Sequence, residues 1–332
     1  MILDVENLIV QFKTDEGIVR AVDGVSFSVS AGETLGIVGE SGSGKSVTNL
    51  AVMGLVPRPP GRVVDGTAVF RGDDLLKMDQ RQLAKIRGHH VAMIFQDPMT
   101  SLNPFLTIAQ QMTEVTRLHL GHSYQQALQH AIKMLKRVGM PSPERRIHDY
   151  PHQLSGGMRQ RVMIAMALSC KPALLIADEP TTALDVTIQA QILDLMKQLQ
   201  QEEQTAIILI THDLGVIAGT CHRVVVMYAG RFVEEAGADE LFRRPLHPYT
   251  LGLLESIPRL DEHKGARLTP IAGQPPHLVD LPAGCPFRPR CPFAMERCAV
   301  ENPPLEGEGE HRKACFVDVE EATPHKPLAS NS

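Results

Sequence analysis

An eight-residue segment has the residue types and spacing needed to bind a nucleotide phosphate. It reads Gly39-Glu-Ser-Gly-Ser-Gly-Lys-Ser46 and fits the pattern G-x-x-x-x-G-K-[ST] without a mismatch. Glycines let backbone N–H groups point inward around an anion at the positive N-terminus of a helix. In this pattern Lys45 reaches the β- and γ-phosphates, and the Ser46 hydroxyl is a ligand for Mg²⁺. The positions that we expect to contact the nucleotide here are Gly39, Ser41, Gly42, Ser43, Gly44, Lys45, Ser46 and Val47.

Two adjacent carboxylates, Asp178 and Glu179, follow the apolar run at residues 174–177. In an open parallel sheet, ligands bind at the carboxyl ends of the strands. Asp178 suits the coordination shell of Mg²⁺, directly or through water. Glu179 is then placed to orient or deprotonate the water that attacks the γ-phosphate. An apolar run that ends in Asp-Glu is a weak signal alone, but with the phosphate loop it predicts nucleotide hydrolysis.

The segment Ser155-Gly156-Gly157 is a second candidate anion site. Serine followed by glycines is typical of a helix start, and helix N-termini bind anions. If a helical subdomain separates this site from residues 39–46, the phosphate that it holds must lie on another copy. The sequence therefore predicts a composite active site made by two subunits.

Four of the six cysteines lie in the last fifth of the chain, at Cys285, Cys291, Cys298 and Cys315. Four thiolates suit either a tetrahedral Zn²⁺ or a [4Fe–4S] cluster. The spacing differs from the C-x-x-C of zinc ribbons, and prolines beside two of the cysteines favour the iron–sulfur cluster. Zn²⁺ and free or regulatory thiols remain alternatives. We expect a structural role, because a segment with little periodic core benefits from a metal staple. Three nearby arginines would partly offset the charge of a cluster or be solvated: Arg288, Arg290 and Arg297.

Hydrophobic periodicity predicts the elements that position these residues. Strands are expected at 8–12, 25–29, 34–38, 173–177, 206–210 and 224–227. The helical pattern at 183–201 lies between two buried strands and implies parallel pairing through a crossover helix. A helix is expected at 47–55, and residues 100–165 are expected to be mainly helical, with a capping box formed by Ser123 and Gln126.

Composition excludes several classes of protein. The 332 residues are 43% hydrophobic and 21% charged, which is ordinary for a globular protein. The net charge of −5 gives no sign of a nucleic-acid binder, so no nucleic-acid partner is expected. No apolar run approaches the ~20 residues of a membrane-spanning helix, and the acidic start is unlike a secretory signal. We expect a cytoplasmic protein that reaches a membrane only through a partner.

The segment Leu154-Ser-Gly-Gly-Met-Arg-Gln160 resembles the signature motif that separates ABC ATPases from other P-loop proteins. Its fifth residue is usually Gln and is Met158 here, a change that keeps the serine hydroxyl and both glycines. Three further segments match motifs of this family and occur in the same order along the chain. Gln96 resembles the Q-loop glutamine, Thr182-Ala-Leu-Asp185 resembles the D-loop, and His212 resembles the switch histidine that contacts the γ-phosphate.

Other residues narrow the resemblance to the ATPases of bacterial dipeptide, oligopeptide and nickel importers, and within them to the D-type subunits. They are Asp97-Pro-Met-Thr-Ser-Leu-Asn-Pro104 and His247-Pro-Tyr-Thr250, together with the methionine in the signature. Related dipeptide-transporter subunits hold an iron–sulfur cluster at the corresponding cysteines. Phe12 is a candidate for the aromatic side chain that stacks on adenine, and equally for a core residue.

The resemblance implies an α/β fold: a RecA-like parallel-sheet core with an antiparallel β-subdomain and a helical signature subdomain. It implies an ATPase domain at 1–241, with the helical subdomain at about 97–165. A small metal-stapled extension would follow at 242–318, and a disordered tail at 319–332.

The implied function is hydrolysis of ATP to power the import of di- or oligopeptides across the bacterial inner membrane. Glu179, His212 and Gln96 would act in catalysis, and Ser46, Gln96 and Asp178 would hold Mg²⁺. The implied partners are a second ABC ATPase subunit in a heterodimer, two integral-membrane permease subunits and an extracytoplasmic solute-binding protein. The chain would then lie peripherally on the cytoplasmic face of the membrane.

Three alternatives are an importer of nickel or another small solute, a soluble ABC ATPase of DNA repair or translation, and a non-catalytic binding subunit. Soluble ABC ATPases usually carry two cassettes or long coiled-coil insertions, and this chain has one cassette and neither insertion. Intact Lys45, Asp178, Glu179 and His212 disfavour a non-catalytic subunit.

Overall fold

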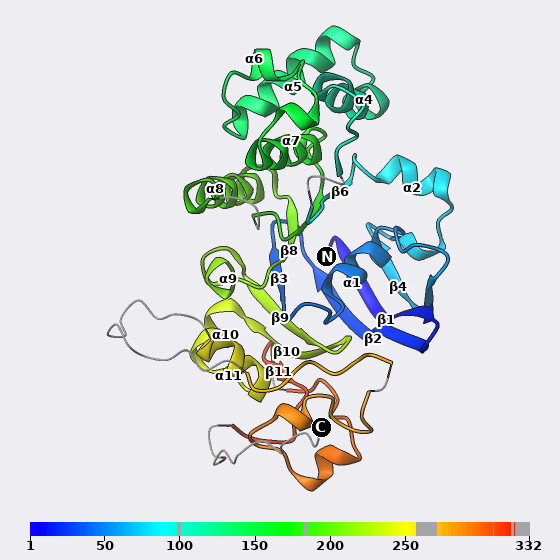
Figure 1. Cartoon of the computed structure of the whole chain (residues 1–332), viewed down its shortest axis with the longest axis vertical. Helices are drawn as coiled ribbons and strands as arrows, with labels where there is room; N and C mark the ends of the chain where they lie inside the picture. The colour runs from blue at the N-terminus through cyan, green and yellow to red at the C-terminus, as the bar shows by residue number, and fades with distance from the viewer. Residues whose placement is uncertain are drawn as a thin grey trace. The chain divides into compact units, whose positions relative to one another are not determined.

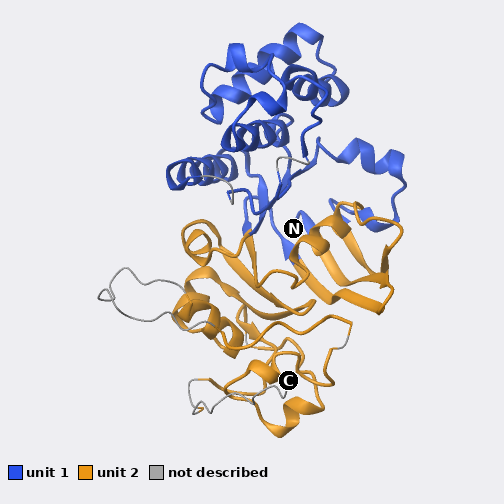
Figure 2. Ribbon diagram, in the orientation of Figure 1, with its two compact units in different colours: residues 1–3, 28–34, 69–210 blue, residues 4–27, 35–68, 211–332 orange. Residues whose placement is uncertain are grey.

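The computed structural model describes residues 1–97, 101–181, 185–256, 271–279, 281–307, 309–319 and 322 (Figure 1). The chain forms two compact units, shown in different colours in Figure 2. Unit 1 contains residues 1–3, 28–34 and 69–210, and unit 2 contains residues 4–27, 35–68 and 211–332. The chain passes between the units several times, so each unit combines segments that are distant in sequence.

Three parallel strands form the centre of unit 1: β6 (Val91–Ile94), β7 (Leu174–Asp178) and β8 (Ala206–Ile210). β7 lies in the middle, and its Leu174 is opposite Val91 on one side and Ala206 on the other. Every residue of the three strands is buried, as the apolar runs predict for strands covered on both faces. Helix α8 (Val186–Glu203) lies between β7 and β8 in the chain, which confirms the predicted parallel crossover.

The helices of unit 1 that follow β6 pack on one another. They are α4 (Ile108–Leu120), α5 (Tyr124–Arg137) and α7 (Gly156–Leu168), and α7 also contacts β6. Ser123 forms the predicted capping box with Gln126 at the start of α5. The shorter elements of unit 1 are β5 (Asp73–Asp74), η1 (Leu75–Lys77), α2 (Gln80–Ile86), α6 (Pro143–Arg146) and η2 (Pro151–Gln153).

Two groups of strands belong mainly to unit 2. In the first group, β1 (Leu3–Thr14) lies between β2 (Gly17–Val29) and β4 (Gly61–Phe70). In the second, β9 (Arg223–Tyr228) pairs in parallel with β3 (Thr34–Val38) and antiparallel with β10 (Arg231–Gly237), whose outer neighbour is β11 (Arg312–Lys313). The strands predicted from the sequence are present, although β1 and β2 are longer than expected. The strands that were not predicted are β4, β5, β6, β10 and β11.

The helices of unit 2 connect and cover these strands (Figure 1). They are α1 (Lys45–Val52), α9 (Leu214–Thr220), α10 (Ala238–Arg243), α11 (Pro248–Glu255), η3 (Arg288–Arg290) and η4 (Glu296–Ala299). α1 follows β3 directly through the phosphate loop, residues 39–46. This is the strand–loop–helix order that the nucleotide-binding pattern requires.

The described part of the chain after α10 shares a core with the strands of unit 2. Tyr249, Phe287 and Val317 pack in one hydrophobic cluster with Val226 and Tyr228 of β9. Polar contacts add to this packing, because the buried carboxylate of Glu234 on β10 accepts hydrogen bonds from the N–H groups of Leu246 and His247. The domain boundary predicted between residues 241 and 242 stays a prediction.

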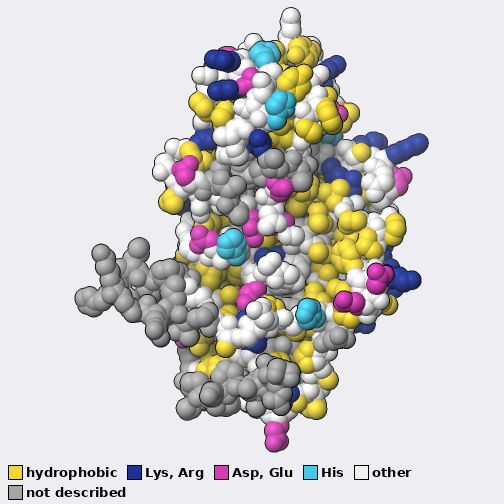
Figure 3. All heavy atoms as spheres, viewed as in Figure 1, with side chains coloured by type: hydrophobic (Ala, Val, Ile, Leu, Met, Phe, Trp, Pro, Cys, Tyr) yellow, Lys and Arg dark blue, Asp and Glu magenta, His cyan; other side chains and the backbone are white. Residues whose placement is uncertain are grey.

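Among the described residues, no helix is both long and apolar enough to cross a membrane. On the face shown in Figure 3, described Lys and Arg side chains are interspersed with Asp and Glu.

Candidate functional site

The phosphate loop lies so close to neighbouring backbone that glycine is required at its ends. Gly44, the N-cap residue of α1, has φ +107°, and a Cβ there would lie 2.3 Å from the carbonyl oxygen of Ala21. A Cβ at Gly39 would lie 2.1 Å from the carbonyl oxygen of Met227. Any larger residue would therefore force the loop away from β2 and β9. The glycine positions of the pattern thus have a steric cause besides the phosphate binding predicted from the sequence.

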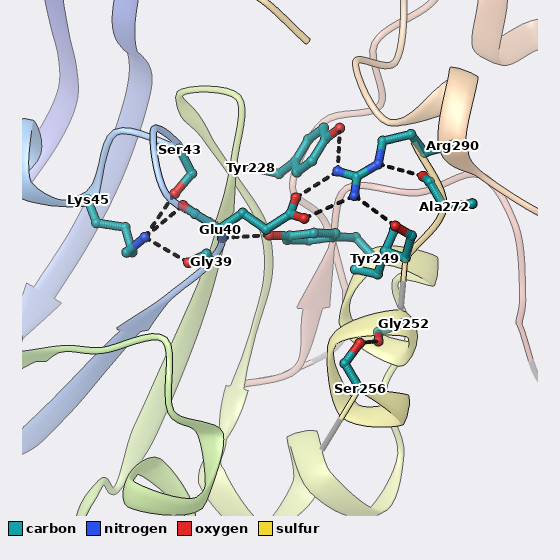
Figure 4. A network of polar contacts seen from close by, with 11 residues as sticks. Gly39, Glu40, Ser43, Lys45, Tyr228, Tyr249, Gly252, Ser256, Ala272 and Arg290 are labelled. Atoms are coloured by element: carbon teal, nitrogen blue, oxygen red, sulfur yellow. Dashed lines mark hydrogen bonds and ion pairs between the residues drawn. The ribbon is translucent and has the colours of Figure 1, made fainter. Parts of the chain in front are cut away.

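Lys45 is buried, and its side chain turns back into the phosphate loop (Figure 4). Its Nζ donates hydrogen bonds to the carbonyl oxygens of Gly39 at 2.7 Å and Glu40 at 2.8 Å. The lysine ammonium thus lies inside the loop whose N–H groups are predicted to bind phosphate. Ser41 and Gly42 are exposed, whereas Ser43 is buried and Ser46 and Val47 are half-buried.

The ends of β6 and β7 bring Gln96 and Glu179 together in unit 1. The Nε2 atom of Gln96 donates a hydrogen bond to Oε2 of Glu179 at 3.1 Å. Glu179 has φ +47°, a left-handed conformation that is uncommon outside glycine, asparagine and aspartate, and its N–H donates to the carbonyl oxygen of Ile210 at 2.9 Å. Strained residues of this kind cluster at functional sites. The amide of Gln96 holds the carboxylate in one orientation, as a group that positions water requires.

Asp178, the last residue of β7, is buried next to Glu179. A carboxylate at this position, the serine hydroxyl of Ser46 and the amide oxygen of Gln96 are hard oxygen donors of the kind that Mg²⁺ prefers. The donor chemistry of the predicted magnesium ligands therefore fits the ion. Ser46 belongs to unit 2, and the other two residues belong to unit 1.

Two further predicted residues lie in unit 2 with the phosphate loop. His212 is exposed, directly after the end of β8 and before α9. Phe12 is half-buried on β1, and its ring lies against Gly61. A Cβ added at Gly61 would lie only 2.7 Å from Cε1 of Phe12. The contact with Gly61 suits a packing residue. The roles of His212 at the γ-phosphate and of Phe12 at adenine stay predictions.

The predicted signature segment is the N-terminus of α7 in unit 1. Ser155 is the N-cap residue, and its Oγ accepts a hydrogen bond from the N–H of Met158 at 3.3 Å. Ser155 and Gly156 are exposed, Gly157 is half-buried, and a Cβ at Gly156 would have no atom of the described chain within 4 Å. The segment is thus accessible to a ligand that arrives from outside the chain.

Asp185, from the predicted D-loop, is the N-cap residue of α8 and accepts the N–H of Ile188 at 3.0 Å. The remaining D-loop residues at 182–184 and the Pro-Met-Thr of residues 98–100 lie outside the described residues.

The four clustered cysteines are free thiols. The pKa of Cys291 is raised to about 12, mainly by burial, with smaller contributions from the charges of Cys315, Cys285 and Cys298 that are opposed by the N–H of Phe293. Among the described residues, however, no three His, Cys, Asp or Glu side chains form a group that could hold a metal ion. The expectation of a metal-stapled extension is therefore not supported. Hydrophobic packing against β9 and β10 holds this segment in place.

Part of the surroundings of these sulfur atoms does suit metal-bound thiolates. The N–H of Phe293 donates to Sγ of Cys291 and the N–H of Val317 donates to Sγ of Cys315, each at 3.4 Å. Hydrogen bonds to sulfur stabilise the thiolate form and are among the factors that tune iron–sulfur clusters.

One set of contacts at the phosphate loop was missed by the sequence reasoning. Arg290, predicted to offset a cluster charge or to be solvated, instead binds the carboxylate of Glu40 (Figure 4). Glu40 occupies an unspecified position of the phosphate-binding pattern, and 250 residues separate it from Arg290. The only local signal was the position of Arg290 between two cysteines.

Comparisons with known proteins agree over almost the whole chain. The family described as ABC transporter matches residues 22–182, and the family described as Oligopeptide/dipeptide transporter, C-terminal region, matches residues 233–298. The chain is 56% identical to the oligopeptide transport ATP-binding protein OppD of Haemophilus influenzae, over 90% of this chain and 92% of that protein. It is 54% identical to OppD of Salmonella typhimurium (97% and 95% covered) and 52% identical to AppD of Bacillus subtilis (96% and 98%).

Among solved structures, the fold is similar to a dimeric ATP-binding cassette in a post-hydrolysis state bound to ADP and Pi. The TM-score is 0.66 at 28% sequence identity, and the match covers 71% of this chain and 98% of the other.

Proposed function

This chain belongs to the ABC transporter family of ATP-binding proteins, and we propose that it is the ATP-hydrolysing subunit of an importer for oligopeptides. The predicted ABC ATPase fold is confirmed by the family match and by the similar cassette structure. Relatives that are more than half identical to this chain are ATP-binding proteins of oligopeptide transport. No observation favours nickel as the substrate.

The contact between Gln96 and Glu179 is the observation that carries the proposed chemistry. It fixes a carboxylate at the end of β7, beside the buried Asp178. Mg²⁺, when bound, neutralises charge that develops on the phosphates. Glu179 orients and deprotonates the attacking water, and Lys45 binds the phosphates from inside the phosphate loop.

We further propose that the active site is shared by two subunits. Ser155 and Gly156 are exposed at the start of α7, where N–H groups and the positive helix end bind anions. They would contact the γ-phosphate of ATP held by a second ABC ATPase subunit, while Asp185 faces that subunit. The partner in this arrangement would be a different ATPase subunit, so that the pair is a heterodimer.

The remaining partners follow from the same proposal. An importer needs two integral-membrane permease subunits and an extracytoplasmic solute-binding protein besides its ATPase subunits. The chain would then bind peripherally to the permeases on the cytoplasmic face of the bacterial inner membrane. The Q-loop region around Gln96 would transmit the movement caused by ATP hydrolysis to the permease subunits.

A [4Fe–4S] cluster at Cys285, Cys291, Cys298 and Cys315 is a separate proposal, with Zn²⁺ as the alternative. Its support is the occurrence of the four cysteines in the last fifth of the chain and the N–H groups that donate to the Sγ atoms of Cys291 and Cys315. Anaerobic purification followed by iron, sulfide and zinc analysis tests it. Broad absorption near 400 nm with about four irons per chain would support the cluster. One zinc per chain, or no metal, would exclude it and leave the ATPase proposal intact.

Reconstitution tests the transport proposal. The chain would be purified with its partner ATPase and permeases, placed in proteoliposomes and assayed for ATP hydrolysis with peptide-loaded binding protein. Peptides are expected to stimulate hydrolysis, and Glu179→Gln to abolish the stimulation. Glu203→Gln, which alters an ion pair with Lys171 on the surface, is the matched control. Stimulation by nickel but not by peptides would refute the substrate, and absence of any hydrolysis would refute the activity.

A further inference from the structure

The phosphate loop is joined to the cysteine-bearing part of the chain by an ion pair with two hydrogen bonds (Figure 4). Nη1 of Arg290 lies 2.7 Å from Oε2 of Glu40, and Nη2 lies 2.9 Å from Oε1. Arg290 is in η3, between Cys285 and Cys291, and only 4% of its side chain is exposed. Parallel pairs of this kind between arginine and carboxylate are the strong, orienting form of the interaction.

Other contacts fix both members of the pair. Nε of Arg290 donates to the carbonyl oxygen of Ala272 at 3.0 Å, and Nη1 donates to the hydroxyl of Tyr228 at 3.3 Å. The N–H of Glu40 donates to the hydroxyl of Tyr249 at 2.8 Å, while its carbonyl oxygen accepts from Lys45. Glu40 is therefore held at its amide, its carbonyl group and its carboxylate. One of these contacts is made by the lysine that binds phosphate.

The charge of Glu40 is unfavourable for the function of the phosphate loop. A carboxylate in the second position of a loop that binds a polyphosphate repels the ligand unless a cation neutralises it. Burial alone would lower the pKa of Arg290, but its hydrogen bonds to Glu40 and Tyr228 raise it, so the guanidinium is charged. Arg290 thus supplies the neutralising cation, and it does so from a segment that lies far away in the sequence.

We propose that Arg290 is a positioning residue for ATP binding, which neutralises Glu40 and holds the start of the phosphate loop in its binding conformation. This inference deepens the proposed function and rests on it. It also gives the C-terminal extension a role in nucleotide affinity, because the fold around Cys285 and Cys291 places the arginine.

Binding of a fluorescent ATP analogue to the full-length chain tests the proposal. For Arg290→Gln we expect the Kd to rise about tenfold, equivalent to ~1.4 kcal/mol. Glu40→Gln removes the repelling charge, so its Kd should stay within about threefold of the wild type. In the double variant, the loss caused by Arg290→Gln should be largely reversed. In the assembled transporter, Arg290→Gln should raise KM for ATP and leave kcat nearly unchanged.

Arg312→Gln is the matched control, because Arg312 lies in the same extension, pairs with Glu235 of β10, and has no described contact with the phosphate loop. If Arg290 only stabilises the fold, Arg290→Gln and Arg312→Gln will lower the melting temperature and leave the Kd unchanged. That result overturns the proposal, as does a double variant that binds no better than Arg290→Gln.

Should Arg290→Gln fail to fold, Arg290→Lys decides the question, because lysine keeps the charge and loses the paired geometry. The proposal requires a Kd about threefold above the wild type, and wild-type affinity would overturn it. Failure of the wild-type chain itself to bind the analogue would refute the proposed function instead.

Discussion

Replacing Gly44 by alanine should weaken ATP binding through a displacement that the structure defines. Gly44 has φ +107°, and an added Cβ would lie 2.3 Å from the carbonyl oxygen of Ala21. Real Cβ contacts essentially never fall below 3.0 Å, so the loop or the strand must move by about 0.7 Å. A misplacement of ~1 Å can lower the rate of an enzyme reaction roughly a hundredfold. By analogy, we expect the affinity for ATP to fall by about ten- to a hundredfold.

The control separates this displacement from backbone strain. Gly72 has φ +95°, and a Cβ there would have no atom of the described chain within 4 Å. Gly72→Ala should therefore lower the free energy of unfolding by about 1–2 kcal/mol, the strain of a left-handed residue, without changing affinity for ATP. Titration with a fluorescent ATP analogue and chemical denaturation measure the two quantities. Equal ATP affinities for the Gly44→Ala and Gly72→Ala proteins would refute the steric explanation.

Three other variants test the site and the extension. Glu179→Gln should reduce kcat for ATP hydrolysis by about 10²- to 10⁴-fold while Kd for ATP changes little, and equal losses in both would contradict a role in activating water. Ser155→Ala should reduce hydrolysis in a mixed dimer only at the ATP site completed by the altered subunit, as single-turnover assays would show. Burial lowers the pKa of His247 to about 4, below its usual 6.5, so the unfolded chain takes up the proton first as pH falls. Stability should thus fall by about 3 kcal/mol between pH 6.5 and pH 4 and then level off, and His247→Asn should remove most of this dependence in denaturation curves.

Residues whose role depends on their near neighbours in sequence could be predicted. The phosphate loop is one case, since strand, glycines, lysine and helix follow one another within about twenty residues and the chemistry requires that order. The cap residues Ser123 and Ser155 are another, because each hydrogen-bonds an N–H three residues ahead. The buried strand β7 was evident because covering both faces of a strand requires an unbroken apolar run.

Residues whose role depends on distant segments could not be predicted in the same way. Arg290 stands in a Pro-Arg-Cys sequence that would look the same on a solvated surface, and only the fold places it against Glu40. The spacing of the cysteines likewise shows that their sulfur atoms could meet, but not how they are oriented. Strand β4, with Gly66 and several exposed residues, has too weak an alternation to be recognised before its neighbour β1 is known.

The left-handed backbone conformation of Glu179 allows the loss of folding stability at this position to be measured. A left-handed conformation costs an L-residue about 1–2 kcal/mol, and glycine avoids this strain. Glycine also makes the unfolded chain more flexible, which offsets about 0.4–1 kcal/mol of the gain. Glu179→Gly should therefore unfold at a free energy about 0.5–1 kcal/mol higher than Glu179→Gln, although both variants lack the carboxylate. If the two unfold at the same free energy, the conformation is not strained. If the Glu179→Gly protein is the more stable, the chain keeps a destabilising residue at position 179. The chemistry of the Glu179 carboxylate is then the physical reason that remains.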